Sequence, residues 1–413
     1  MVERTTCLVV GGGPAGMVLG LLLARAGVAV TVLEKHGDFL RDFRGDTVHP
    51  STLQLLDELG LGERFAALPQ SHVSQIGFPI GPDRRVVVGD LGRLKVAHPY
   101  IALVPQWDFL NLLAEAGAAE PTFHLRMNTE MTELVRDPSG RVRGVRYRRA
   151  DGGTGEIHAE LTVACDGRWS LARRQAGLST RGFPVPIDVW WFRLPRYASD
   201  GVGSLTPAAG NGRLLIVIPR EGYYQIAYVG RKGIDQQLRT RGVAAFRQDI
   251  ADLVPWLADR VDALASMDEV KHLDVRVNRL RRWHVDGLLC IGDAAHAMSP
   301  VGGVGINLAV QDAVAAATLL AGPLRAGTVR PADLAKVRSR RLLPTIATQT
   351  LQRLMHRNLV APIIEGRRSG PPKPALALLQ RVPAASYLPA YLIGIGLRPE
   401  HAPAFARRAT ASR

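Results

Sequence analysis

A glycine-rich turn near the N-terminus constrains the fold of this chain more than any other feature of its sequence. The apolar run TTCLVV leads into GGGPAG, which is followed by the apolar segment MVLGLLLARAG and then by the β-branched residues of VAVTVLE. This order predicts strand, tight turn, helix and strand over residues 5–34, with Gly27 in the position of a helix C-cap glycine. Such a βαβ unit predicts an α/β fold with a Rossmann-type domain.

The spacing of the glycines predicts a dinucleotide site. Gly11, Gly13 and Gly16 form G-x-G-x-x-G, in which the first glycine permits the turn, the second lets the backbone approach a pyrophosphate, and the third lets the helix pack closely on the strand. Glu34 ends the second strand about 20 residues later, where a carboxylate can accept hydrogen bonds from a ribose. The predicted contact residues are Gly11, Gly13, Pro14, Ala15, Gly16, Glu34 and Lys35. The motif alone leaves FAD and NAD both open.

The chain carries a strong positive charge. Its 413 residues include 52 Lys and Arg against 37 Asp and Glu, a formal net charge of +15. This excess of positive charge suggests nucleic acid or an anionic membrane as a partner. The arginines are scattered, however, as in Arg141, Arg143 and Arg146, and we find no basic run with interleaved aromatic residues. We therefore predict a solvated, arginine-rich surface that attracts anionic cofactors, and no nucleic-acid partner.

We expect neither a membrane-spanning segment nor a signal peptide. The longest apolar run that we identify, Met17–Ala24, is far shorter than the roughly 20 residues that a spanning helix needs. The N-terminus MVERTTCLVV passes directly from charged residues into a strand, without the apolar core of a signal peptide. These features predict a cytoplasmic protein without integral membrane association. Cys7, Cys165 and Cys290 lack paired spacing, so we expect buried thiols and no metal site.

The rest of the chain suggests a second sheet and a helical C-terminal region. Strand-like pieces at 84–104 and 141–165 predict antiparallel hairpins, and VPIDVWWFRLP, GRLLIVIPR and YYQIAYVG predict a separate sheet between 185 and 230. The sequence after 345 is helical and then punctuated by prolines. We expect a discontinuous cofactor domain at 1–75, 100–178 and 281–345, an inserted antiparallel-sheet substrate domain at 76–99 and 179–280, and a C-terminal helical region and tail at 346–413.

A second strand, loop and helix occurs at 287–317, GLLCIGDAAHAMSPVGGVGINLAVQDAVAAA. It resembles the G-D motif of the FAD-dependent aromatic hydroxylases, the p-hydroxybenzoate hydroxylase family. The resemblance implies that Asp293 binds the ribityl chain of FAD, and that the helix after the loop directs its positive end at the flavin. The matching residues, with the flavin contacts that they imply, are Gly292, Asp293, Pro300, Gly302, Gly303, Gly305, Ile306 and Asn307.

Two further segments resemble the same family. The sequence LTVACDGRWSLAR at 161–173 is similar to its D-G motif, and this implies that Asp166 contributes to binding of FAD and of the pyridine nucleotide. Arg44 and Gln106 match two other cofactor-contacting positions. The cofactor is thereby expected to be bound FAD, with NAD(P)H as a transient co-substrate. A single Rossmann unit argues against a disulfide reductase with two such units.

The resemblance also implies the reaction. NAD(P)H would reduce FAD, O2 would add to the reduced flavin, and the flavin C4a-hydroperoxide would hydroxylate or epoxidise a small aromatic or quinone-like substrate. No protein nucleophile is required, so the expected contribution of the protein is a dry pocket that positions the ring. A homodimer is possible. The residues expected in the pocket wall are His49, Trp190, Trp191, Tyr223, Tyr224, Tyr228 and Pro300.

The character of the substrate follows from one strand. Residues 214–218, Leu-Leu-Ile-Val-Ile, are apolar on both faces, so we expect a neutral, apolar substrate, because an unpaired buried carboxylate is costly. Arg193 or Arg220 would provide a charge partner if either side chain turned inward.

Three other functions remain open. One is a flavin-dependent reductase or dehydrogenase of an isoprenoid or polyketide. Another is a halogenase, because residues 190–195 partly resemble the halogenase pattern W-x-W-x-I-P, although Phe192 and Leu194 depart from it. The third is a non-enzymatic basic flavoprotein, for which salt-dependent binding to DNA or anionic vesicles would be diagnostic.

Overall fold

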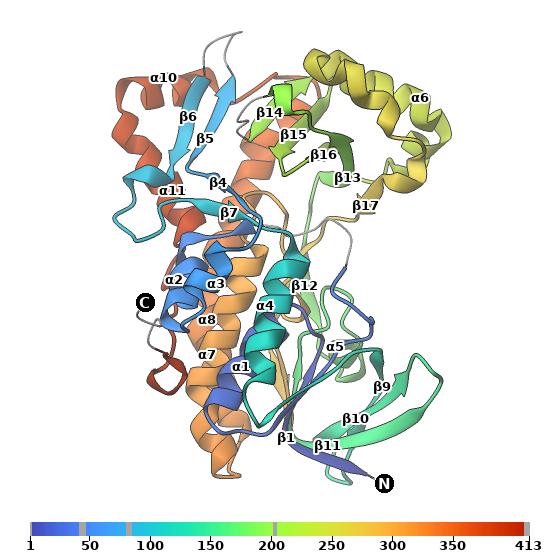
Figure 1. Ribbon diagram of the computed structural model, residues 1–413, viewed down its shortest axis with the longest axis vertical. Helices are drawn as coiled ribbons and strands as arrows, with labels where there is room; N and C mark the ends of the chain where they lie inside the picture. The colour runs from blue at the N-terminus through green and yellow to red at the C-terminus, as the bar shows by residue number, and fades with distance from the viewer. Residues whose placement is uncertain (1, 41–46, 80–84, 201–204, 409–413) are drawn as a thin grey trace.

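The computed structural model describes residues 2–40, 47–79, 85–200 and 205–408 (Figure 1). Its large sheet confirms the predicted βαβ unit: β1 and β2 are parallel, with Val10 opposite Leu33, and α1 (Pro14–Arg25) connects them. Gly27 follows α1 with φ of 78°, as a C-terminal glycine should. The strands of this sheet are β1 (Glu3–Val10), β2 (Val30–Leu33), β8 (Phe123–Arg126), β9 (Thr129–Arg136), β10 (Val142–Arg149), β11 (Thr154–Ala164), β19 (His284–Val285) and β20 (Leu288–Cys290).

Three strands of the large sheet end at the same level. Val10 of β1 is the register partner of Ala164 of β11, and Ala164 is the partner of Cys290 of β20, all in parallel pairing. The loops that follow these three strands therefore emerge side by side at one edge of the sheet. They are the glycine turn, the D-G segment and the G-D segment, so the topology brings together three motifs that are far apart in the sequence.

A second sheet of five antiparallel strands lies above the large sheet in Figure 1. Its order is β14-β15-β16-β13-β17, which confirms the separate antiparallel sheet predicted for 185–230. One face packs against α6 (Asp235–Leu253), drawn in yellow. The strands are β13 (Ile187–Pro195), β14 (Thr206–Gly210), β15 (Arg213–Pro219), β16 (Tyr223–Arg231) and β17 (Lys271–Leu273). The pair β12 (Thr180–Phe183) and β18 (Val277–Leu280) runs between the two sheets.

The predicted hairpin over 84–104 is wrong. β6 (Arg85–Asp90) pairs instead with the preceding β5 (Gln75–Pro79), and β7 (Ile101–Leu103) pairs with β3 (Thr47–Val48) and β4 (Ser71–Val73). The strand run stops because Asp90 caps a short 3-10 turn, its carboxylate accepting a hydrogen bond from Gly92 N at 3.1 Å. The hairpin predicted at 141–165 is confirmed by the antiparallel pairing of β10 with β11.

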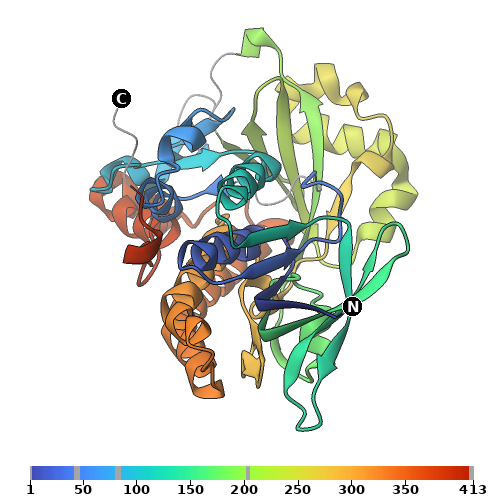
Figure 2. The same ribbon diagram turned by 60° about the horizontal axis from the view of Figure 1, so that its bottom comes forward.

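The C-terminal helices α10 and α11 pack against the β5–β6 hairpin. Figures 1 and 2 both show the red C-terminal helices beside the β5–β6 hairpin, and α10 and α11 contact β6. The helical C-terminal region predicted after residue 345 is observed. The remaining helices are α2 (Pro50–Glu58), α3 (Gly62–Ala66), α4 (Gln106–Ala118), α5 (Leu171–Gln175), α7 (Gly305–Arg325), α8 (Pro331–Met355), α9 (Ala361–Ile364), α10 (Lys373–Arg381) and α11 (Tyr387–Gly394).

Helix α7 is long and apolar enough to cross a membrane by length and composition, and it is longer than the run Met17–Ala24 singled out from the sequence. Yet 72% of its most apolar window is buried inside the protein. Its apolar surface is therefore used in the core, where it packs against α1 and α8.

A buried ionic network ties α7 to α8 and to the G-D segment. Asp312 on α7 and Arg341 on α8 both have fully buried side chains, and Arg341 Nε donates to Asp312 Oδ1 at 3.0 Å. The other carboxylate oxygen contacts His296 Nε2 and accepts from Gly292 N at 3.1 Å. Burial opposes ionisation of Asp312, but His296 and Arg341 outweigh it and hold the pKa of this carboxyl below its usual value.

We predict that Asp312→Ala lowers the free energy of unfolding by about 3–5 kcal/mol, because it removes the nearer of the two carboxylates that pair with the buried Arg341 and leaves Gly292 N without its acceptor. Urea denaturation measures the change. The control is Glu130→Ala, which removes a half-exposed partner of Arg148 and should cost no more than about 1 kcal/mol. Since the native pKa of Asp312 is lowered, its contribution should be present above about pH 4 and decline as the pH falls further. Equal losses in the two variants would contradict this assignment.

Candidate functional site

A cavity of about 1630 Å³ extends from the glycine turn to the five-stranded sheet. Residues predicted to bind the cofactor line one end of it: Gly11, Gly13, Pro14, Ala15, Glu34, Lys35, Gln106, Asp166, Asp293, Pro300, Gly303, Gly305 and Ile306. The opposite end is lined by apolar side chains of the five-stranded sheet and of the C-terminal helices. The topology therefore joins the predicted cofactor residues and an apolar chamber in one space.

The glycine turn has the close contacts that its sequence requires. A Cβ atom at Gly11 would lie 2.5 Å from the carbonyl oxygen of Cys165, and one at Gly16 would lie 2.0 Å from the carbonyl oxygen of Gly11. At Gly13, by contrast, a Cβ would meet nothing within 4 Å, and this glycine faces the cavity. The open space at Gly13 lies at the N-terminus of α1, whose first turn has no side-chain cap and no acidic residue. Free N–H groups there suit a pyrophosphate.

Glu34 is positioned beside this turn. The residue is 2% exposed, and its carboxylate accepts hydrogen bonds from Gly12 N at 2.9 Å and from His36 N at 3.1 Å. These bonds fix the side chain at the end of β2, where it lines the cavity. The arrangement suits recognition of the ribose hydroxyl groups of an adenosine.

The D-G segment contributes a buried carboxylate. Asp166 Oδ2 accepts hydrogen bonds from Leu171 N at 2.7 Å and from Ala172 N at 3.2 Å. Its other oxygen is buried and has no hydrogen-bond partner among the described residues. Burial raises the pKa of Asp166 against the effect of these hydrogen bonds. A buried polar atom without a partner in the lining of a cavity points to a ligand that supplies one.

The G-D segment approaches the same space from β20. Asp293 lines the cavity, and Arg168 Nη2 of the D-G segment lies 3.6 Å from its carboxylate. Arg173 Nη1 joins the two segments again by donating to Ala294 O at 2.9 Å. The N-terminus of α7 also faces the cavity at Gly305, with neither a side-chain cap nor an acid in its first turn. Its partial positive charge would stabilise negative charge on a ligand bound there.

Several predicted cofactor residues do not line the cavity. A Cβ at Gly292 would lie 3.2 Å from Ala309 and 3.3 Å from Ala15, so this glycine serves the packing of α1 on α7. The side chain of Asn307 points away from the cavity towards α2. Its Oδ1 accepts hydrogen bonds from Ser51 Oγ at 3.0 Å and from Thr52 Oγ1. Gly16 is likewise a packing residue, as its motif position implies. Arg44 lies outside the described residues.

These features together fit FAD. The open cradle at Gly13 and the carboxylate of Glu34 suit the diphosphate and adenosine, while Asp166, Asp293 and the N-terminus of α7 lie where the other half of a long dinucleotide would reach.

The aromatic residues predicted for the pocket wall divide between the two faces of the sheet. Trp191 lines the cavity, as does Pro300. Trp190, Tyr224 and Tyr228 do not, which corrects the prediction, because they belong to the core between the sheet and α6. Successive side chains of a strand point to opposite faces, so the neighbours Trp190 and Trp191 cannot share one pocket.

The other two predicted wall residues are also placed elsewhere. His49 is fully buried at the N-terminus of α2, with Nδ1 2.8 Å from Ile393 O, and burial lowers its pKa to about 4. It therefore joins α2 to α11 as a neutral ring. Tyr223 packs under the guanidinium group of Arg193, 4.6 Å from the ring centroid. Neither residue lines the cavity.

The apolar chamber has one charged group in its sheet wall. The chamber face of the sheet carries Ile187, Val189, Trp191, Leu214, Ile216, Ile218, Arg220, Gln225, Ala227 and Val229. Arg220 is 4% exposed, and its Nε and Nη2 donate to Gln225 Oε1 at 3.0 and 2.8 Å. Residues 214–218 are apolar as predicted, and Arg220 at the end of β15 turns inward, which is the alternative that the sequence left open.

Sequence reasoning missed the contribution of the C-terminal region. The cavity lining continues through Leu351, Leu354, Met355, Leu359, Pro371, Pro372, Leu376, Leu379, Leu388, Pro389, Leu392 and Ile393. The leucine spacing in 373–381 indicates an amphipathic helix, but no local signal says which surface its apolar face covers. Trp169, 53% exposed in the D-G segment, was also missed.

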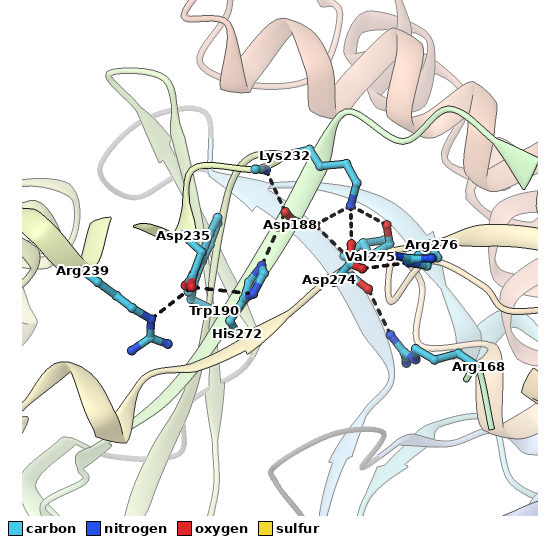
Figure 3. Close-up of polar contacts among 11 residues, drawn as sticks. Arg168, Asp188, Trp190, Lys232, Asp235, Arg239, His272, Asp274, Val275 and Arg276 are labelled. Carbon is cyan, nitrogen blue, oxygen red and sulfur yellow. Dashed lines mark hydrogen bonds and ion pairs between the residues drawn. The ribbon is translucent and has the colours of Figure 1, made fainter. Parts of the chain in front are cut away.

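A polar network holds the D-G segment against the five-stranded sheet (Figure 3). Arg168 Nη1 donates to Asp274 O at 3.4 Å, and Lys232 Nζ bridges Asp188 at 2.8 Å and Asp274 at 2.6 Å. Figure 3 also shows Trp190 directed at Asp235, to which its indole N–H donates at 2.7 Å. The network fixes the sheet relative to the cofactor end.

We predict that Asp293→Ala abolishes stable FAD binding while the protein remains folded, because the cavity loses the carboxylate beside Arg168 without losing core packing. The flavin content of the purified variant, read from its absorbance spectrum, measures the effect, and circular dichroism checks the fold. Asp252→Ala serves as the control because Asp252 is exposed on α6 and should leave the flavin content unchanged. Full flavin occupancy in Asp293→Ala would refute the role of this residue.

Comparison with known proteins agrees with the geometry. Residues 4–352 match the family model of an FAD binding domain. The chain is 35% identical over 389 residues to the 6-methylpretetramide 4-monooxygenase of Streptomyces rimosus, covering 92% of this chain and 90% of that protein. It is 30% identical over 321 residues to the rifampicin monooxygenase of Streptomyces venezuelae, covering 74% of this chain and 62% of that protein.

A solved structure shares the fold. The anhydrotetracycline hydroxylase OxyS from Streptomyces rimosus superposes with a TM-score of 0.72 at 22% identity, covering 95% of this chain and 76% of that one. The family match, the relative with near full-length coverage and the three motifs around one cavity all lead to the same assignment. The chain belongs to the family of FAD-dependent aromatic and polyketide monooxygenases.

Proposed function

We propose that this monooxygenase inserts one atom of O2 into a multi-ring aromatic or quinone-like substrate of the polyketide type. The other oxygen atom leaves as water, and NAD(P)H supplies the two electrons. The observation that carries the proposal is the continuous cavity, which places an apolar chamber directly beside the residues suited to FAD. The 35% identical relative, named for oxygenation of 6-methylpretetramide, supports the substrate class.

The size of the cavity favours a large substrate. Pockets for single small ligands have volumes of roughly 300–1000 Å³, whereas this cavity measures about 1630 Å³. The extra volume accommodates FAD together with a second bulky molecule. A simple hydroxybenzoate would leave much of the apolar chamber unfilled.

The polar groups in the chamber indicate how a substrate is oriented. Arg220 and Gln225 lie at one end of the sheet face, and the buried indole N–H of Trp191 has no hydrogen-bond partner among the described residues. A substrate with an apolar ring system and oxygen atoms along one edge matches this pattern. A carbonyl or phenolate oxygen can accept from Arg220 or from Trp191, while the rings contact Val189 and Ile216.

The remaining lining residues keep water from the reacting centre. Bound FAD would supply the oxygen-transfer chemistry, and the side chains of the chamber position the ring and limit hydration. No side chain of the protein needs to form a covalent bond with the substrate.

The electron donor would approach from the D-G segment. Trp169 lines the cavity and is half exposed, and the guanidinium group of Arg276 lies 3.9 Å from its ring centroid. With Arg168 and Arg174 also in the lining, this side of the cavity offers a stacking surface and positive charge. Both suit an anionic nucleotide that binds transiently.

The direct test is turnover under labelled O2 with NAD(P)H and a panel of polycyclic phenols and quinones. We expect the product mass to increase by one labelled oxygen atom. A product reduced or dehydrogenated without label would instead support a reductase or dehydrogenase. Chloride-dependent turnover to a chlorinated product would support a halogenase.

A pair of neighbouring tryptophans tests the chamber. Trp191→Phe should raise the KM for substrate by roughly two- to tenfold, as expected for a lost hydrogen bond of about 0.5–1.5 kcal/mol. Trp190→Phe is the matched control on the opposite face. It removes the bond to Asp235 and should lower the melting temperature without changing KM. Equal KM changes in the two variants would show that Trp191 does not contact the substrate.

A further inference from the structure

Three arginines surround a single phenylalanine ring on the strand pair between the two sheets. Arg181 of β12 lies directly opposite Arg279 of β18 in antiparallel register. Their guanidinium carbons are 5.3 and 4.8 Å from the centroid of the Phe183 ring. Arg353, in the last turn of α8, contributes a third guanidinium at 4.6 Å from the same centroid. We call Arg181, Arg279 and Arg353 the arginine cluster.

The positive charge of the arginine cluster is not balanced by acidic residues. Throughout the described ranges, no Asp or Glu forms an ion pair with any of its members. Arg279 Nη1 donates to Gln349 Oε1 at 3.1 Å, which is an uncharged acceptor. Burial and the two neighbouring guanidinium groups lower the pKa of Arg279.

Other arginines on the surface form ion pairs with acidic residues. Arg146, for example, has Glu133 at 2.7 Å and Glu156 at 3.3 Å. Like charges directly opposite each other destabilise a strand pair, so the arrangement of Arg181 and Arg279 is unfavourable until an anion neutralises it.

Three guanidinium groups without acidic partners in the described part of the chain suit an anion that carries more than one negative charge and several acceptor oxygens, as a phosphate group does. A guanidinium group is a planar fork that donates two parallel hydrogen bonds to phosphate oxygens, and it stays charged at every physiological pH. Stacking on Phe183 restrains the three side chains before a ligand arrives, which reduces the entropy lost on binding. Arg181 and Arg353 are exposed, and Arg279 is half-buried. A dissolved anion can therefore reach the cluster, in which the guanidinium group of Arg279 is partly shielded from water.

We propose that the arginine cluster is a binding site for a phosphate-bearing anion, separate from the cofactor and substrate cavity. The arginine cluster combines residues of β12 and β18 with one residue from the last turn of α8. The neighbouring residues Leu354 and Met355 line the cavity, so the phosphate site lies close to its rim. The phosphate belongs either to a free phosphorylated metabolite or to the 2′-phosphate of NADPH. The site itself does not depend on the oxygenation proposed above.

Calorimetry of the FAD-loaded enzyme with inorganic pyrophosphate at low ionic strength tests the site. The wild type should show saturable binding at one site. Arg181→Gln combined with Arg353→Gln should weaken the Kd at least tenfold. Arg143→Gln combined with Arg148→Gln removes the same charge from the exposed, acid-paired face of β10 and should bind as the wild type does. Absence of saturable binding in the wild type, or equal weakening in both double variants, would overturn the proposal.

Steady-state kinetics with NADPH and with NADH separate the two sources of the phosphate. A raised KM for NADPH alone in the Arg181→Gln, Arg353→Gln variant would identify the reductant as the ligand. Unchanged KM values for both reductants, together with lost pyrophosphate binding, would identify a separate phosphorylated metabolite.

Discussion

The alignment of three parallel strand ends is the constraint on which the rest of the structure depends. Val10, Ala164 and Cys290 are register partners, so the loops that follow them leave the sheet at one level. Cys7–Val10, Leu161–Ala164 and Leu288–Cys290 are buried without a break, so both faces of the sheet are covered at these strand ends. The shared register brings the three loops to one cofactor.

The features that sequence could predict are local ones. The glycine turn requires a tight bend and close helix packing, and the contacts of Gly11 and Gly16 show both. Glu34 was placed correctly because its position depends only on the length of one βαβ unit. The D-G and G-D motifs were recognisable because a few residues in fixed spacing carry most of their geometry.

The features that sequence reasoning missed depend on packing between distant segments. Trp190 and Trp191 had to lie on opposite faces of β13, but only the position of α6 decides which face meets the cavity. The contribution of α10 and α11 to the lining depends on how they pack beside the β5–β6 hairpin. Asn307 matched a motif, yet Ser51 and Thr52 on another helix hold its side chain away from the cavity.

The lining of the cavity extends beyond the residues that match the FAD-binding family model. The family match ends at residue 352, whereas the wall of the apolar chamber continues to Ile393. Mutations in this C-terminal stretch can alter the shape of the chamber while every strand end and loop that suits FAD remains in place. The set of molecules that fit the chamber can therefore change without any change in the residues suited to FAD.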